Sequence, residues 1–165
     1  CNPADMMAAK STDAWACFKG HTCQQADANQ AYTQAPFVGN TDTYARLPNN
    51  RWPQEWKVKY PNLVDPVYKL NRALYGHPDS GTYWEQHCNA QCRAVGFVPI
   101  AGWPSCFYHP DLKILLIIYV DDMKMAGPAD VLPKAWDLLR KDTALTKCLK
   151  IGPIEPAANC FGLYP

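Results

Sequence analysis

The sequence lacks several features that would assign a class of protein at once. No two of its eight cysteines form a CxxC pair, so neither a zinc ribbon nor a dense disulfide scaffold is indicated. No apolar run approaches membrane-spanning length, and the longest, at residues 114–120, is the size of a strand. The N-terminal residues carry no charged-then-apolar leader, which favours a reducing compartment over secretion. These absences predict a chain that is neither secreted nor inserted in a membrane.

The sequence also lacks a marked excess of charge of either sign, since 16 basic and 15 acidic residues give a net charge of +1. Phosphate-binding domains are usually visibly basic, so any nucleic-acid surface must be local. What is present is enough apolar sequence, 48% of 165 residues, for one core, and we expect a single domain over residues 1–165. Because the chain begins at Cys1 and not at Met, we expect a piece of a longer product, truncated at both ends.

The sequence predicts short helices and strands joined by turns. Its 15 prolines and nine glycines argue against a bundle of long helices. The best-signalled helix starts at Asp79 or Ser80 and ends before Gly96, with Thr82 and Glu85 as its capping box. Helices are also expected at 3–19 and 130–140, the latter with Pro133 in its first turn. Strands are expected at residues 21–27, 44–47, 66–70, 97–100, 106–108, 113–120, 123–126 and, weakly, 160–163.

The order strand, helix, hairpin, helix, strand predicts the α+β class. It is typical of a split βαβ, ferredoxin-like arrangement, in which helices pack on one face of an antiparallel sheet. Many chemistries use this arrangement, so function has to come from a site.

Asp121 and Asp122 directly follow the apolar run of the expected strand at 113–120. Two adjacent carboxylates repel each other at the rim of a core, and a divalent cation offsets that repulsion. Mg²⁺ suits such a pair because it needs few protein oxygens besides water and substrate phosphates. Aspartates are also common in turns, and an isolated Asp-Asp pair is more simply explained that way.

The Tyr-Val-Asp-Asp sequence at residues 119–122 is followed by Gly127. With other segments around it, this box resembles one family, the reverse transcriptases of copia-type LTR retrotransposons, in which it carries two catalytic aspartates on a hairpin turn. The resemblance runs from about Met6 to Gly162 and suggests a divergent branch. The matching segments, in the family's order, are residues 26–32, 70–76, 83–85, 96–97, 105–107 and 119–122.

The resemblance implies an RNA-directed DNA polymerase with a palm-like fold and partial fingers. Asp27 and Asp121 would bridge two Mg²⁺ ions, or Mn²⁺, with Asp122 an accessory ligand. In two-metal sites one ion activates the primer 3′-hydroxyl and the other stabilises the leaving group. Positioning and charge are sufficient for phosphoryl transfer, so no protein nucleophile is needed.

The same resemblance implies a nucleotide site. Tyr32, five residues after Asp27, would exclude the 2′-hydroxyl of a ribonucleotide, although a tyrosine on its own is more simply a core residue. The triphosphate would meet the backbone amides near Gln30 and Ala31. By analogy, Tyr75 and Gly76 would contact the nucleotide and the template.

A locally basic, aromatic segment spans residues 46–72. Cations over phosphates and rings under bases would suit a template strand, and solubility and core packing explain the segment equally well. The candidate template contacts are Arg46, Arg51, Lys57 and Arg72.

The chain departs from the family at residues 77–81, where a basic stretch is expected and His-Pro-Asp-Ser-Gly stands. We find no counterpart of the family's basic fingers hairpin, thumb, RNase H or integrase in the 165 residues. The expected partners are an RNA template, a DNA primer, dNTPs and the rest of a Pol polyprotein active in DNA integration. The expected location is the cytoplasm, in a virus-like particle, or the nucleus. Three alternatives stay open: an inactive retroelement remnant, a different carboxylate metalloenzyme such as a nuclease, and a nucleic-acid-binding module.

Overall fold

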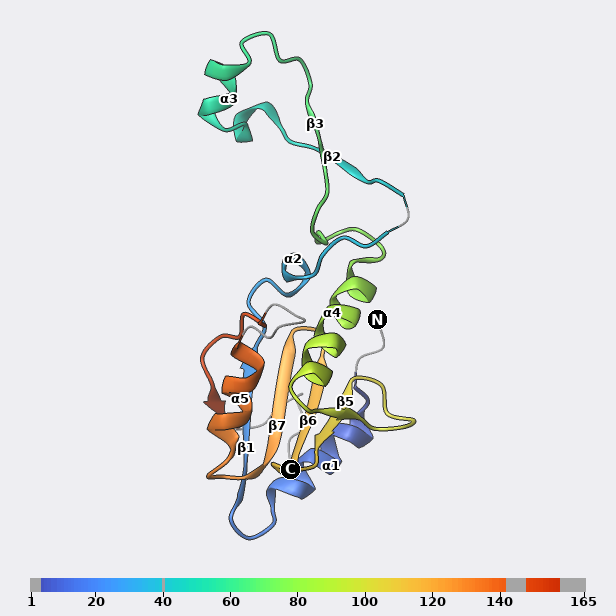
Figure 1. The fold of residues 1–165 in the computed structure, drawn as a ribbon, viewed down its shortest axis with the longest axis vertical. Coiled ribbons are helices and arrows are strands. Elements are labelled where there is room, and N and C mark those ends of the chain that lie inside the picture. Colours follow the sequence, from blue (N-terminus) through green and yellow to red (C-terminus); the bar gives the residue numbers. More distant parts are fainter. Residues whose placement is uncertain (1–3, 40, 142–147, 158–165) are drawn as a thin grey trace.

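The computed structural model describes residues 4–39, 41–141 and 148–157. These residues form a body, in which helices cover an antiparallel sheet, and an arm that projects from it (Figure 1). The protein is therefore of the predicted α+β class.

The sheet has six strands in the order β4-β5-β6-β7-β1-β8. Neighbouring strands are antiparallel throughout, with β6 and β7 forming a tight hairpin at the centre. Five of the six residues of β6 are buried, as expected for the longest apolar run of the sequence. The strand bounds are β1 His21–Asp27, β4 Val98–Pro99, β5 Cys106–His109, β6 Ile114–Tyr119, β7 Asp122–Pro128 and β8 Glu155–Pro156.

The connections interleave the strands. Both β1 and β6 pair with β7, so they run parallel to each other with β7 between them. The chain passes from β1 to β6 by way of α4 (Ser80–Ala94), and from β7 to β8 by way of α5 (Leu132–Arg140). This interleaving brings the end of β1 beside the β6–β7 turn, although the two are far apart in sequence.

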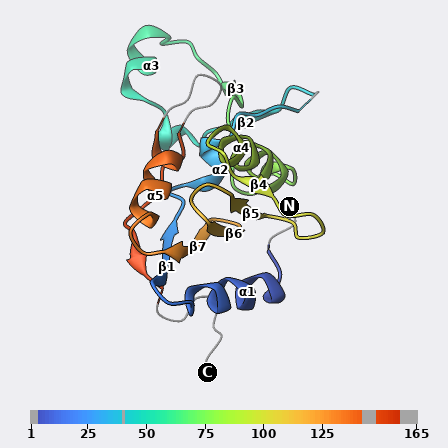
Figure 2. The same cartoon turned by 60° about the horizontal axis from the view of Figure 1, so that its bottom comes forward.

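Helices cover both faces of the sheet (Figure 2). On one face, Trp84 and Cys88 of α4 and Trp136 of α5 pack against Leu116 and Met125 in the main core. On the other face lies α1 (Met6–Ala16), which packs against the sheet in a second, smaller cluster of buried residues. The prediction that helices pack on one face only is therefore wrong. The reason lies in β6, whose first five residues are all apolar. Successive side chains of a strand point to opposite faces, so both faces of β6 have to be removed from water. The second cluster contains Ala4, Ala8, Ala9, Cys106 and Ile117.

A buried ion pair holds α1 to the sheet. Lys124 of β7 is 2% exposed, and its Nζ donates to the Asp13 carboxylate of α1. Trp15 adds a hydrogen bond from its Nε1 to the carbonyl of Lys113 at 3.1 Å. Small apolar contacts and these polar links together replace the wide apolar stripe of an ordinary surface helix.

Two local predictions need correction. Asp79 is the N-cap of α4 and makes no side-chain cap, and Thr82 lies inside the helix, so the predicted capping box is wrong. Ser80 Oγ instead donates to the carbonyl of Leu74 at 2.6 Å, which ties the helix start to the preceding segment. Pro133 does lie in the first turn of α5, as predicted. The strand expected at 160–163 lies outside the described residues.

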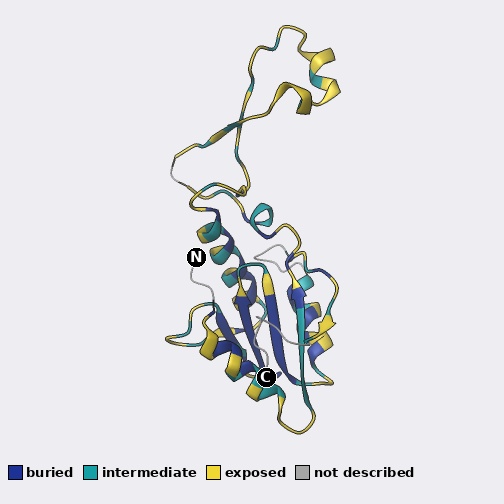
Figure 3. Cartoon of the chain, turned by 180° about the vertical axis from the view of Figure 1, so that it is seen from behind, coloured by how far each residue is buried: buried dark blue, intermediate teal, exposed yellow. Residues whose placement is uncertain are grey.

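The arm comprises residues 41–70. Strands β2 (Tyr44–Arg46) and β3 (Val67–Lys69) pair with each other, and η1 (Asn49–Arg51) and α3 (Gln54–Lys59) form the tip. Figure 3 shows an almost wholly exposed arm next to the buried strands of the body. The helices α2 (Ala31–Gln34) and α3 were not predicted, because four to six residues are too few for a periodic pattern.

No helix within the described ranges is both long enough and apolar enough to cross a bilayer.

Candidate metal centre

Three aspartates come together where β1 ends and β7 begins. Asp27 is the last residue of β1, and the sheet register pairs it directly with Asp122, the first residue of β7. Asp121 lies near both because it occupies the two-residue turn that joins β6 to β7. One carboxylate oxygen from each of the three residues lies within 4.8 Å of the others. The structure thus brings together all three residues that the sequence proposed as metal ligands.

The electrostatics of this cluster favour a cation. Burial raises the pKa of Asp27, and the neighbouring Asp121 raises it further. The pKa of Asp122 is raised in the same way, by burial first and then by Asp121 and Asp27. All three groups are partly or fully accessible, so an ion can reach them. Hard carboxylate oxygens in this number fit Mg²⁺ or Mn²⁺, which complete their shells with water and phosphate oxygens.

The β6–β7 turn adopts an unusual backbone conformation. Val120 has φ of 58°, a region that β-branched residues rarely enter. Its carbonyl accepts a hydrogen bond of 2.5 Å from Nε1 of Trp84 on α4. The next carbonyl, that of Asp121, accepts one of 2.8 Å from the amide of Ala28. Both carbonyls of the turn are therefore held from outside it.

A segment from the far end of the chain clamps the residues after Asp27. The amide of Gly152 donates to the Asp27 carbonyl at 2.8 Å, and the amide of Asn29 donates to Lys150 at 2.9 Å. The side chain of Gln34 spans the same backbone: it accepts from the Lys150 amide at 2.7 Å and donates to the Lys150 carbonyl at 3.0 Å. These contacts were not predicted, because nothing in the local sequence distinguishes a glutamine that bridges two distant segments.

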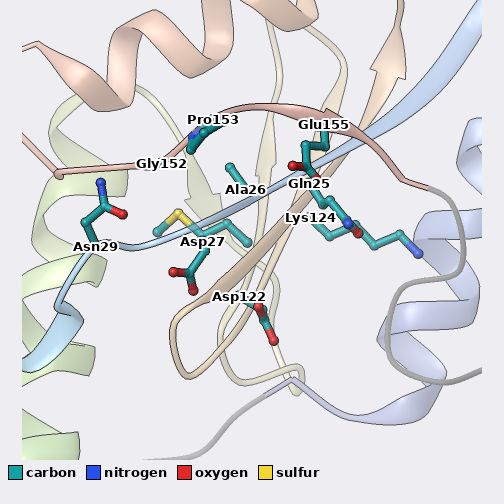
Figure 4. A pocket seen from close by; sticks show the side chains of 10 residues that line it. Gln25, Ala26, Asp27, Asn29, Asp122, Lys124, Gly152, Pro153 and Glu155 are labelled. Carbon is teal, nitrogen blue, oxygen red and sulfur yellow. The ribbon is translucent and has the colours of Figure 1, made fainter.

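A cavity of about 340 Å³ opens beside the carboxylates. Figure 4 shows Asp27 and Asp122 facing this opening beneath the segment that carries Gly152 and Pro153. A Cβ on Gly152 would lie 3.3 Å from the Asp27 carbonyl and from Oδ1 of Asn29, so a side chain there would crowd the wall. The cavity is lined by Gln25, Ala26, Asp27, Asn29, Asp122, Met123, Lys124, Gly152, Pro153 and Glu155.

Two of the residues expected at a nucleotide site, Tyr32 and Tyr75, are in contact. The rings of Tyr32 and Tyr75 lie 4.6 Å apart with 38° between their planes. Tyr32 packs against the main core, and Tyr75 is 54% exposed. Gly76 has φ of 93°, which explains a glycine at this position. Gln30, also at positive φ, and the buried Ala31 form the start of α2.

The four proposed template residues are not brought together. Arg46, Arg51 and Lys57 lie on the arm, away from the carboxylates (Figure 1). Arg46 is paired with Asp65 at 3.0 Å. Arg72 instead lies against α2, where its Nη1 donates to the Gln34 carbonyl at 2.7 Å. Of the four, Arg51 and Lys57 lie at the tip of the arm, and Arg72 has a structural partner.

The chain is similar to a transposon protein. The chain is 27% identical over 101 residues to a Saccharomyces cerevisiae protein named for the transposon Ty5-1, a match that covers 60% of this chain. The match covers 31% of the yeast protein, so the chain spans about a third of that relative's length. No family model matches the chain. No solved structure matches it either. The similarity points to a retrotransposon origin and does not by itself specify a copia-type reverse transcriptase.

Proposed function

We propose that this chain is the polymerase core of a copia-like reverse transcriptase, an RNA-directed DNA polymerase that joins dNTPs to a primer 3′-hydroxyl. The observation that carries the proposal is the convergence of Asp27, Asp121 and Asp122 at adjoining strand ends. The resemblance of residues 119–122 to the Tyr-Val-Asp-Asp box and the similarity to a transposon protein support it. On this proposal the body is a palm, and the arm is part of the fingers.

In this function Asp27 and Asp121 hold two Mg²⁺ ions, or Mn²⁺, and Asp122 assists. Bound ions at such a centre supply the positive charge that lowers the pKa of the primer hydroxyl and stabilises the leaving pyrophosphate. The chain itself contributes orientation: the ends of β1 and β7 hold the carboxylates in register, so little reorganisation is needed during the reaction.

Sugar selection falls to Tyr32. Its ring packs against Tyr75 on one side and the core on the other, which limits its movement. A rigid ring next to the sugar excludes a 2′-hydroxyl by steric overlap. Gln30 and Ala31 would present backbone amides to the triphosphate, and Gly76 would let the backbone approach the nucleotide closely.

The partners of this activity are an RNA template, a DNA primer and dNTPs, together with the integrase and RNase H portions of a Pol polyprotein. The proposed location is the cytoplasmic virus-like particle or the nucleus.

A second candidate, a nucleic-acid-binding module, is favoured by the tip of the arm. Arg51 and Lys57 are exposed there, and within the described residues neither forms an ion pair. Tyr60 is 49% exposed, with Nζ of Lys59 5.5 Å from its ring centre. Exposed cations beside aromatic rings are the usual means of holding a single strand.

Primer extension separates these functions. With poly(rA), labelled oligo(dT), dTTP and Mg²⁺ or Mn²⁺, we expect the wild-type chain to extend the primer and Asp121→Asn to fall to the level measured without protein. Asp111→Asn is the matched control, because Asp111 is an exposed aspartate in the turn at the opposite end of β6.

The failure outcomes are distinct. Cleavage of the oligonucleotide without dNTPs would indicate a nuclease. Template binding that is unchanged in Asp27→Asn/Asp121→Asn, with no extension by the wild type, would indicate a binding module. If the wild-type chain neither extends the primer, nor cleaves the oligonucleotide, nor binds the template, the chain is an inactive retroelement remnant.

A further inference from the structure

A buried tryptophan contacts the turn that carries Asp121. Trp84 is the fifth residue of α4, is 1% exposed, and donates its Nε1 hydrogen to the Val120 carbonyl at 2.5 Å. Val120 immediately precedes Asp121 and shares the two-residue turn with it. The indole of a core residue is thus hydrogen-bonded to the residue that precedes Asp121 in the sequence.

The turn has reason to need this contact. At φ of 58°, Val120 is in a conformation that an L residue branched at Cβ adopts only when its surroundings impose it. If Val120 relaxed to negative φ, the peptide between Val120 and Asp121 would rotate, and the Asp121 side chain would leave its position beside Asp27. A donor that is itself immobile in the core holds that peptide in place.

The second carbonyl of the turn has its own donor. The Ala28 amide binds the Asp121 carbonyl at 2.8 Å, and Ala28 directly follows Asp27. One donor therefore comes from α4 and the other from the residue that follows the strand carrying the partner carboxylate. The position of Asp121 relative to Asp27 depends on both contacts.

We propose that Trp84 is a positioning residue for the carboxylate centre, acting through the Val120 carbonyl to hold Asp121 in its metal-binding position. The kinetic part of this inference rests on the proposed polymerase function, and the metal-binding part does not. The substitution that isolates the indole N–H is Trp84→Phe, which keeps an aromatic ring in the core.

Trp136 provides a matched control. It is fully buried on the same side of the sheet, and its Nε1 donates to Oε1 of Gln24 at 3.0 Å. Trp136→Phe therefore makes the same change from indole to phenyl in the same core, with loss of the same N–H, and it leaves the turn untouched.

Mn²⁺ binding, measured by electron paramagnetic resonance on the free protein, is the first readout. We expect Trp84→Phe to weaken Mn²⁺ about tenfold or more, the usual effect of losing a residue that orients a metal ligand. Trp136→Phe should lower the melting temperature by a similar amount and leave Mn²⁺ affinity close to wild type. Equal Mn²⁺ affinities in the two variants would overturn the positioning role.

The kinetic readout is primer extension. Trp84→Phe should lower kcat while the KM for dTTP stays close to wild type, because the nucleotide pocket is unchanged. A wild type that binds Mn²⁺ but extends no primer would refute the polymerase function, and the Mn²⁺ comparison would still decide the role of Trp84.

Val120→Gly tests the mechanism and covers the case in which Trp84→Phe does not fold. Glycine adopts positive φ without strain, so the turn should depend less on the indole. In the Val120→Gly background we expect Trp84→Phe to fold and to change Mn²⁺ affinity much less than it does with Val120 present. A folded double variant that has lost Mn²⁺ binding relative to Val120→Gly would overturn the proposal.

Discussion

At the scale of single residues, the carboxylates of Asp27 and Asp122 are held where they repel each other and Asp121. Burial is the larger cause of the raised pKa values of Asp27 and Asp122, and this repulsion adds to it. Because both groups remain largely accessible, water screens part of it, and the cost to stability is small. A centre of this kind gives up some stability of the metal-free protein in exchange for affinity for cations.

The first prediction concerns Asp122→Asn in the absence of divalent ions. A carboxyl with a raised folded-state pKa binds more protons in the folded than in the unfolded chain, so stability is lost as pH rises from the ordinary value of 3.8 through the raised value. At pH 7 the repulsion is fully present, and Asn should raise the free energy of unfolding by roughly 0.5 kcal/mol, a value kept low by solvent screening. Urea unfolding in EDTA at pH 7 measures this gain.

The gain should disappear near pH 3, where the wild-type carboxyls are protonated, and Mg²⁺ should stabilise the wild type more than the variant at pH 7. Asp111→Asn, far from the cluster, should behave as wild type at both pH values. A loss of stability in Asp122→Asn at pH 7 without metal would contradict the repulsion.

Residue-level reasoning from sequence identified the aspartates but not their supports. Asp121 and Asp122 stand out because they follow an apolar run, and Asp27 stands out only through the family resemblance. Trp84 of α4 is 1% exposed. Its hydrogen bond to Val120 could not be predicted, since that depends on how α4 is placed over the sheet.

At the scale of elements, α1 is held to the sheet by an ion pair, by a hydrogen bond from Trp15 and by contacts of small apolar residues. Lys124 is buried, while its partner Asp13 has a side chain that is 48% exposed. A buried cation that loses its partner is costly, whereas removing both charges is much less so.

The second prediction is therefore a double-mutant cycle. Asp13→Asn should lower the free energy of unfolding by roughly 1–3 kcal/mol, less than for a fully buried pair. Asp13→Asn/Lys124→Met should recover most of that loss, because no unpaired charge remains under α1. Additive effects of the two substitutions, measured by urea unfolding, would show that the pair does not hold the helix.

The third prediction concerns the clamp between α2 and the segment that contains Lys150. Gln34→Ala removes the side-chain amide that both accepts from and donates to the Lys150 backbone. Hydrogen exchange of the Lys150 amide should become about tenfold faster, corresponding to a loss of about 1.4 kcal/mol of local stability.

Gln86→Ala is the control, since Gln86 is exposed on α4. Unchanged exchange at Lys150 in Gln34→Ala would mean that the neighbouring backbone bonds suffice without the side chain.

The elements themselves were predicted unevenly. The strand β1 was predicted with its observed bounds, and β6 and α4 to within one or two residues. The position of α1 was not, because Ala8, Ala9 and Thr12 are too small and too weakly apolar to indicate which surface they cover. β8 was missed because two residues carry no alternation.

At the scale of the whole molecule, the chain divides into a body with a continuous core and an arm with none. No arm residue belongs to either buried cluster among the described residues, and Val58 and Val64 are more than four-fifths exposed at 84% and 86%. The arm leaves and rejoins the body at one place, where the Leu70 amide donates to the Thr43 carbonyl at 2.8 Å.

The fourth prediction is that the arm can be removed. Replacing residues 44–69 with Asn-Gly should shift the melting temperature of the body by less than about 3 °C, because few buried contacts are lost. The same deletion should weaken binding of a fluorescently labelled single-stranded RNA, measured by anisotropy, and should do so most at low salt.

Arg51→Ala/Lys57→Ala, with the arm intact, should reproduce much of the loss of RNA affinity. Unaltered RNA affinity in the deletion would refute a template role for the arm, and loss of cooperative unfolding would show that the body depends on it.

The sequence by itself determined the α+β class, the principal strands, the best helix and the Asp-Asp pair, because each depends on patterns that extend over a few neighbouring residues. Only the tertiary structure decided which residues stand opposite each other: Asp27 beside Asp122, the Trp84 indole under the β6–β7 turn, and α1 on the second face of the sheet. Those arrangements follow from strand register and from the way the helices are placed over the sheet, which are properties of the packed chain and not of any short segment.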